Sequence, residues 1–293
     1  MGPSPKAPFD VDQTTAVAML CAGDNVNGRP NSDVVRPVAS AVDLVGRPRG
    51  LWTIDFGTQL IETASQYEVP FEYVREHILP VRANRRDDYR GQWWQYARPR
   101  PEMRKALEGR GRYIATPGVS KHRIFVWVDS TVLSNQGTLV FARDDDYFLG
   151  VLQSMIHELW ARGTGTQLRD AKSGFRYTPT TTFETFPFPW PPGQEPGEEE
   201  DPRVAAIAEA TRELVAQRDR WLNPGSLPAS KLKQRTLTNL YNQRPTWLQL
   251  AHERLDRAVL DAYGWPHNLD DEELLARLLA LNLARAGAAA IDD

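Results

Sequence analysis

The residues best suited to chemistry in this sequence are basic side chains interleaved with aromatic ones. Residues 82–123 hold 12 Lys or Arg against 4 Asp or Glu, and Trp93, Trp94 and Tyr96 lie among them. Guanidinium groups offer forked donors to phosphate oxygens, while aromatic rings can pack, stack or wedge. The same composition would suit a solvated surface above a core that holds the two tryptophans. Both interpretations stay open on these residues alone.

A second group of candidates follows an expected amphipathic helix that runs from the aspartates at 144–146 to Trp160. The carboxylates would occupy its first turn, where they oppose the helix dipole favourably, and we prefer this role to a metal site. Gly163 and Gly165 can end the helix. The loop beyond places basic residues beside aromatic ones, in the text Lys-Ser-Gly-Phe-Arg-Tyr-Thr at 172–178. Residues 185–190, Thr-Phe-Pro-Phe-Pro-Trp, predict an extended segment that its aromatic rings anchor.

Taken together, residues 154–190 resemble the segment that closes the target-recognition domain of MmeI-like restriction–modification enzymes and related adenine-specific DNA methyltransferases. In that family a helix ending in Trp leads into a Gly-rich loop, an aromatic-Arg-Tyr-Ser/Thr element and a Phe-Pro-Phe/Trp-Pro stop. Residues 31–57 resemble the beginning of the same domain, and motifs within 236–285 resemble the family's helical C-terminal domain. The resemblance extends from about Asn31 to Arg285.

The resemblance implies roles for individual residues. The family's base-reading positions align with Lys172, Gly174 and Arg176, and Gln167 and Arg169 are weaker candidates on the same loop. Arg and Lys can donate to the two acceptors on the major-groove edge of guanine, whereas glycine has no side chain with which to read a base.

Phosphate contacts are expected from basic and hydroxyl side chains earlier in the chain. The candidates are Arg85, Arg86, Arg90, Ser120, Lys121 and Arg123. Ser120-Lys-His-Arg123 lies just before an expected strand and resembles the family's text at that point. A competing account of Arg176 pairs it with a carboxylate such as Glu184, purely for structure.

Methyl transfer in this family needs a glycine-bearing turn that holds S-adenosylmethionine. It also needs an Asn/Asp-Pro-Pro-Tyr/Phe motif for the flipped adenine. The sequence shows neither motif, since Pro191-Pro192 lacks both the preceding Asn or Asp and the following aromatic residue. No nuclease cluster, catalytic triad or metal-ligand spacing is recognisable. We therefore expect no catalytic residue, no metal and no cofactor in this chain, with S-adenosylmethionine bound by a partner chain.

Composition and charge set wider bounds. The single cysteine, Cys21, excludes an internal disulfide framework, and no apolar run approaches the ~20 residues of a membrane span. The N-terminus lacks a signal-peptide pattern, so cytoplasmic residence without a membrane partner is the simplest expectation. Net charge is -3 overall, but residues 1–180 carry +3 and residues 181–293 carry -6. This distribution suits one phosphate-facing part and one solvated or protein-facing part.

The expected architecture is α+β. We expect a loosely ordered segment at 1–30, a mixed α/β target-recognition domain at 31–190, a Pro/Glu/Gly linker at 191–202 and a small helical domain at 203–293. Strands are expected at 51–56, 124–128 and 139–141, and a helix at 70–81. In the C-terminal part, Asp270 and Glu273 have the spacing of a capping box, and Gly264 should end the preceding helix.

These features predict a DNA sequence-recognition subunit or fragment of an adenine-specific DNA methyltransferase, within a restriction–modification or phage-defence system. It would bind duplex DNA and position a catalytic methyltransferase chain. The alternative is a protein-interaction or regulatory module of such a complex that does not read DNA, which the net negative charge supports. An enzyme with an unrecognised site is a third possibility.

Overall fold

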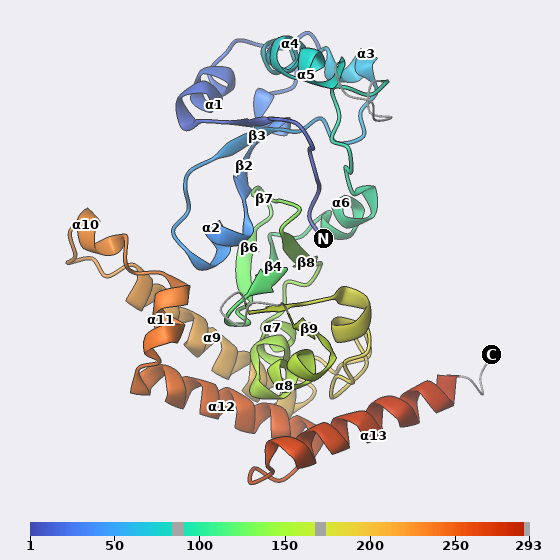
Figure 1. The fold of residues 1–293 in the computed structure, drawn as a ribbon, viewed down its shortest axis with the longest axis vertical. Coiled ribbons are helices and arrows are strands. Elements are labelled where there is room, and N and C mark those ends of the chain that lie inside the picture. The colour runs from blue at the N-terminus through green and yellow to red at the C-terminus, as the bar shows by residue number, and fades with distance from the viewer. Residues whose placement is uncertain (84–90, 168–173, 290–293) are drawn as a thin grey trace. The chain divides into compact units, whose positions relative to one another are not determined.

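The computed structural model describes residues 1–83, 91–167 and 174–289 (Figure 1). The chain divides into two compact units. Unit 1 comprises Met1–Leu44, Pro48–Ala115 and Trp127–Ala142, and unit 2 comprises Val45–Arg47, Thr116–Val126 and Arg143–Asp293. Strands and helices are mixed in the first part of the chain and helices alone follow from residue 202, which confirms the expected α+β class. None of the described helices combines the length and the apolar character of a membrane span.

The strands of unit 1 confirm most of the sequence expectations. One sheet has the order β1 (Asp10–Val11), β3 (Trp52–Ile54), β2 (Val35–Ala39) and β7 (Leu133–Ser134). Another has the order β6 (Val126–Asp129), β4 (Arg112–Pro117) and β8 (Thr138–Phe141). β3 pairs antiparallel with both of its neighbours, and β2 pairs parallel with β7. β3, β6 and β8 correspond to the three expected strands within a few residues.

The helices in this part of the chain are short. They are α1 (Gln13–Leu20), α2 (Ala41–Val45), α3 (Ile61–Ala64), α4 (Glu68–His77), α5 (Leu79–Ala83), α6 (Pro101–Leu107) and the 3₁₀ turn η1 (Asn31–Asp33). The single helix expected at 70–81 is therefore two helices. Pro80 explains the break, because it has no N–H to donate to the carbonyl four residues earlier and its ring clashes with that carbonyl.

Residues 1–30 are not loosely ordered, contrary to expectation. Phe9 and Ala16 are completely buried in the core of unit 1, and Asp12 caps α1 by accepting from the Thr15 amide at 2.8 Å. The turn-rich stretch that suggested looseness is held internally, since the buried side chains of Asn25 and Asn31 are hydrogen-bonded at 2.8 Å. Polar turn residues can thus be ordered once their donors and acceptors are satisfied inside the fold.

Unit 2 combines a small sheet with a helical layer. The sheet has the order β5 (Val119–Ser120), β10 (Phe175–Arg176) and β9 (Thr166–Gln167), with both pairings antiparallel. The helices are α7 (Asp146–Gln153), α8 (Met155–Thr164), the π-helical turn η4 (Pro179–Phe183), α9 (Pro202–Leu222), α10 (Ala229–Leu232), α11 (Leu237–Gln243), α12 (Thr246–Tyr263) and α13 (Asp271–Ala289). The helix expected from residue 144 to residue 160 is interrupted at Ser154. That residue leaves the helical backbone and caps α8 through the His157 amide.

Several local expectations in unit 2 are confirmed. Asp145 caps α7 by accepting from the Phe148 amide at 2.8 Å. Asp270 and Glu273 form the reciprocal capping box of α13, and Gly264 ends α12 with a left-handed backbone. The expected boundaries at 31–190 and 203–293 stay a prediction, because the compact units divide the chain differently and residues 143–190 belong to the same unit as the C-terminal helices.

Candidate nucleic-acid interface

The central strand of the unit 2 sheet projects one basic side chain toward solvent. Phe175 and Tyr177 are 1% and 2% exposed, whereas Arg176 between them is exposed. Successive side chains of a strand point to opposite faces, so the two aromatic rings anchor the strand while the guanidinium stands outside. The cross-strand neighbours of Arg176 are Val119 and Thr166, which are also exposed. The outer face of this sheet is therefore accessible around Arg176.

A buried histidine fixes the inner face of the same strand. His157 Nδ1 lies 2.8 Å from the Leu152 carbonyl oxygen, and Nε2 lies 2.9 Å from the Tyr177 hydroxyl. Because a carbonyl can only accept, Nδ1 carries the proton and Nε2 accepts from Tyr177. Burial lowers the pKa of His157 to about 3, so the ring is neutral at physiological pH. His157 is therefore a structural partner of Tyr177.

Arg123 does not reach solvent, and its expected phosphate contact is corrected to a structural role. The side chain is 2% exposed, and its guanidinium lies 4.8 Å and 5.0 Å from the ring centroids of Phe175 and Tyr177. It donates to the hydroxyl of Thr116 and to the carbonyls of Pro117 and Phe175. Burial lowers the pKa of Arg123 to about 10, which still leaves it charged. Arg123 therefore ties the β4–β5 region to β10.

Gly174 is required by the backbone of this sheet. Its φ is +81°, and a Cβ atom there would lie 2.0 Å from the Ser120 carbonyl oxygen and 2.7 Å from the Lys121 amide nitrogen. No side chain fits so close to another backbone, and non-glycine residues avoid this φ. The glycine at an aligned base-reading position is thus explained by the close approach of β10 to β5.

Lys121 and Ser120 lie at the turn beside β10. Lys121 is exposed, and its Nζ donates to the side-chain oxygen of Asn242 at 2.7 Å. His122 Nε2 lies 2.9 Å from the same oxygen, and the Ser120 hydroxyl donates to the His122 carbonyl at 2.7 Å. The turn is therefore fastened to the end of α11. His122 and Asn242 were not among the candidates, because their pairing joins residues 120 positions apart.

Comparison with known proteins assigns the family. Residues 30–190 match the family model described as MmeI, target recognition domain. The chain belongs to this family. DNA methyltransferase A of Bacillus subtilis (strain 168) is 30% identical over 175 residues, which are 57% of this chain and 17% of that protein. The expected resemblance is thereby confirmed, and this chain spans well under two thirds of that relative.

A solved structure has the same fold as nearly the whole chain. It is that of the Type IIL restriction-modification enzyme MmeI in complex with DNA, and it matches with a TM-score of 0.71 at 18% sequence identity. The match covers 98% of this chain and 35% of that chain. The fold of the helical C-terminal part is therefore shared as well as that of the target recognition domain.

Several candidates in the target recognition domain fall outside the described residues. These are Lys172 and Arg169 on the reading loop, and Arg85, Arg86 and Arg90 in the basic stretch. Gln167 pairs with Phe175 through the backbone of β9. The competing pairing of Arg176 with Glu184 has no support in the described residues, since no hydrogen bond or ion pair joins the two side chains there.

The rest of the basic stretch has mixed roles in the target recognition domain. Trp94 is buried in the core of unit 1 and Trp93 packs against that core partly buried, which agrees with the solvated-surface interpretation. Arg82 is buried and donates to the Pro5 carbonyl at 2.7 Å, and Arg104 makes two bonds to Asp55 at 2.7 and 3.0 Å. These arginines stabilise unit 1. Within the described ranges, no group of three or more His, Cys, Asp or Glu side chains is placed to hold a metal ion.

Proposed function

We propose that this chain recognises a DNA sequence for an adenine-specific methyltransferase of a restriction–modification or phage-defence system. The observation that carries the proposal is Arg176, which stands exposed on a strand that His157, Tyr177 and Arg123 hold rigidly. Its five donors are available to a base edge, and guanine offers two acceptors in the major groove. A reading side chain needs this kind of support, because a flexible one loses specificity.

The proposed phosphate contacts come from Lys121 and Ser120 beside the reading strand. Lys121 reaches the surface, and the turn that carries it is fastened to Asn242. Lys172, Gln167 and Arg169 remain proposed base-reading residues, with Arg85, Arg86 and Arg90 as further phosphate contacts. Phosphate contacts set register and affinity, whereas base contacts determine sequence.

Catalysis is proposed to reside elsewhere. The 293 residues contain neither the Asn/Asp-Pro-Pro-Tyr/Phe motif nor a recognisable cofactor turn. We propose that S-adenosylmethionine and the flipped adenine bind to a catalytic methyltransferase chain in the cytoplasm, which this chain positions on duplex DNA. The relative and the solved structure, which are a DNA methyltransferase and a restriction-modification enzyme in complex with DNA, support this context.

A second candidate function rests on charge. Residues 181–293 carry a net charge of -6, which suits a surface facing a protein rather than DNA. A module that only holds a complex together would bind duplex DNA weakly and without sequence preference.

A selection from randomised duplex DNA separates the two functions. Repeated enrichment of one motif by the purified chain, with affinity that falls steeply as salt rises, is expected for a sequence reader. Absence of any enriched motif, with or without the methyltransferase chain, would overturn the proposal in favour of the interaction module.

A further inference from the structure

A basic segment interrupts the otherwise acidic C-terminal part of the chain. Residues 218–244 hold six Lys or Arg and one Asp, whereas the remainder of residues 181–293 holds six basic and 17 acidic residues. The segment covers the end of α9, the connection through α10, and α11. Its middle part, residues 220–235, is called here the basic arm. Figure 1 shows α10 at the far end of the helical layer from α13.

The basic arm is held in place by contacts within unit 2. Arg47 donates to the Leu232 carbonyl at 3.0 Å, to the Asn223 side-chain oxygen at 2.7 Å and to the Leu222 carbonyl. The Arg235 guanidinium lies 4.4 Å from the ring centroid of Trp221. The Arg47 guanidinium thus joins the two ends of the connection between α9 and α11, and the cation–π contact of Arg235 with Trp221 holds the same two ends together. The arm is a built feature rather than a loose loop.

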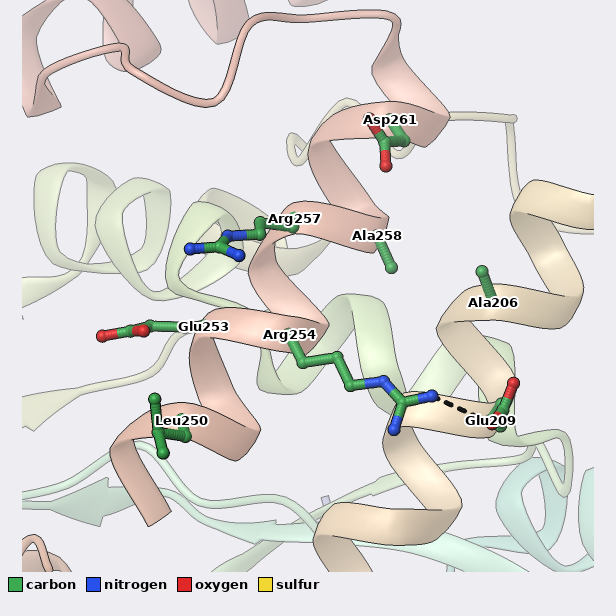
Figure 2. A pocket seen from close by; sticks show the side chains of 8 residues that line it. All are labelled: Ala206, Glu209, Leu250, Glu253, Arg254, Arg257, Ala258 and Asp261. Carbon is green, nitrogen blue, oxygen red and sulfur yellow. Dashed lines mark hydrogen bonds and ion pairs between the residues drawn. The ribbon is translucent and has the colours of Figure 1, made fainter. Parts of the chain in front are cut away.

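The arm presents cations that are not neutralised. Arg220, Lys231 and Lys233 are exposed, and none of them forms an ion pair with a described residue. Some other exposed arginines of this helical layer are paired with carboxylates. Arg212 forms ion pairs with Asp146 and Glu198, and Arg254 forms ion pairs with Glu209 and Glu213. Figure 2 shows the pair of Arg254 with Glu209 across the groove between α12 and α9. The arm therefore gathers three exposed cations without an ion pair to a described residue within residues 220–233.

The arm has no large apolar side chain in the fully exposed class among its described residues, and its Trp221, Leu222, Leu227 and Leu232 are only partly exposed. Large exposed apolar residues of unit 2 include Leu250, Leu279 and Leu283, and none of the exposed ones falls within residues 220–235. Protein interfaces depend on apolar or aromatic anchors at their centre, whereas a phosphodiester backbone needs only donors and positive charge. The chemistry of the arm fits a polyanion.

The arm is linked to the reading sheet through α11, which follows it in the chain. Asn242, at the end of α11, accepts from Lys121 Nζ at 2.7 Å and lies 2.9 Å from His122 Nε2. Lys121 follows β5, which is paired with the strand that carries Arg176. We propose that the basic arm binds the sugar–phosphate backbone of duplex DNA beside the sequence that Arg176 reads. The inference rests on the proposed function and adds a sequence-independent contact from the helical part.

The test compares two charge-matched double variants of the full chain. Lys231→Gln/Lys233→Gln removes two charges from the arm, and Arg257→Gln/Arg277→Gln removes two exposed charges from α12 and α13. Binding is measured against salt on a duplex that carries the enriched motif and extends well beyond it on both sides. Each lost phosphate contact should reduce the log–log salt slope by about 0.9, so the arm variant should lose up to about two units. The control should keep the wild-type slope.

Further measurements keep the outcome decisive. Lys231→Arg/Lys233→Arg should retain the slope, and thermal unfolding shows that all variants fold alike. The enriched motif should be unchanged in every one of them. A folded arm variant with the wild-type salt slope would overturn the proposal that the arm binds DNA. It would leave the role of Arg176 and the proposed function intact. A changed motif would instead assign base contacts to the arm, and a wild-type chain that binds no DNA would overturn both proposals together.

Discussion

The Tyr177 hydroxyl donates to His157 Nε2 across 2.9 Å in a completely buried site, and this bond fixes the strand that carries Arg176. His157 is held from its other side by the Leu152 carbonyl at 2.8 Å. A side chain on α8 therefore determines where β10 lies. The loop that is expected to read DNA thus depends on a helix that contributes no residue to reading.

Removal of the Tyr177 hydroxyl should destabilise the protein. In Tyr177→Phe, His157 Nε2 loses its donor inside the core, and an unsatisfied buried acceptor costs roughly 1–3 kcal/mol. Denaturant unfolding measures the change. Tyr73→Phe is the matched control, because the Tyr73 hydroxyl makes no hydrogen bond with a described residue. Equal stabilities of the two variants would show that the His157–Tyr177 bond contributes nothing net.

Stability should fall as the solution is acidified below about pH 6.5, the pKa of an unperturbed histidine. Burial lowers the pKa of His157 to about 3 in the folded state, so between these values only the unfolded chain binds the proton. The free energy of unfolding should then decrease by up to about 1.4 kcal/mol per pH unit from this residue. Urea unfolding at pH 7, 6 and 5 measures the slope. His157→Gln, although less stable at pH 7, should show a shallower slope, and an equal slope would contradict the assignment.

Gly174→Ala should separate the two strands that Gly174 brings together. The new methyl group would meet the Ser120 carbonyl at 2.0 Å in addition to the strain of φ +81°. Gly193→Ala supplies the control, because Gly193 has φ +87° and no atom within 4 Å of its added Cβ. The control should cost about 1 kcal/mol for backbone strain alone, and Gly174→Ala should cost clearly more in thermal unfolding. Similar losses of stability in the two variants would show that β5 can move away from the new methyl group without an energetic cost.

The sequence predicted those parts of the fold that depend on neighbouring residues. Asp270 and Glu273 cap the start of α13 within a single turn, and Gly264 ends α12 through its own left-handed backbone. Both helix ends can therefore be predicted from neighbouring residues. Arg123 shows the limit of such reasoning. It belongs to a basic run that suggests exposure, yet Phe175 and Tyr177, more than 50 positions later, enclose it. Only the folded chain brings those rings to the guanidinium.

The candidate site divides in the same way. The resemblance pointed to the Phe175–Tyr177 element, and the alternation of side chains along this strand leaves Arg176 exposed. The sequence pattern could not show that Gly174 lets β10 approach the Ser120 backbone closely, because the two residues are far apart in the sequence. It also could not distinguish Lys121, which reaches the surface, from Arg123 two positions later, which does not.

Arg176→Ala should relax the recognised sequence at one base pair. Arg176 is exposed and without an ion pair to any described residue, so truncation to alanine should remove the proposed base contact without unfolding the strand. A bidentate contact to guanine contributes roughly 1–3 kcal/mol of discrimination, about 5- to 150-fold between the right and the wrong base. Selection from randomised duplex DNA should return the wild-type motif with that single position degenerate.

Lys121→Gln is the matched comparison for Arg176→Ala, since it also removes one exposed charge from this sheet region. It should weaken all sequences about equally, lower the salt slope by about one unit and leave the motif intact. An unchanged motif in a folded, DNA-binding Arg176→Ala protein would end the base-reading assignment, and a motif altered only by Lys121→Gln would move it to the β5 turn.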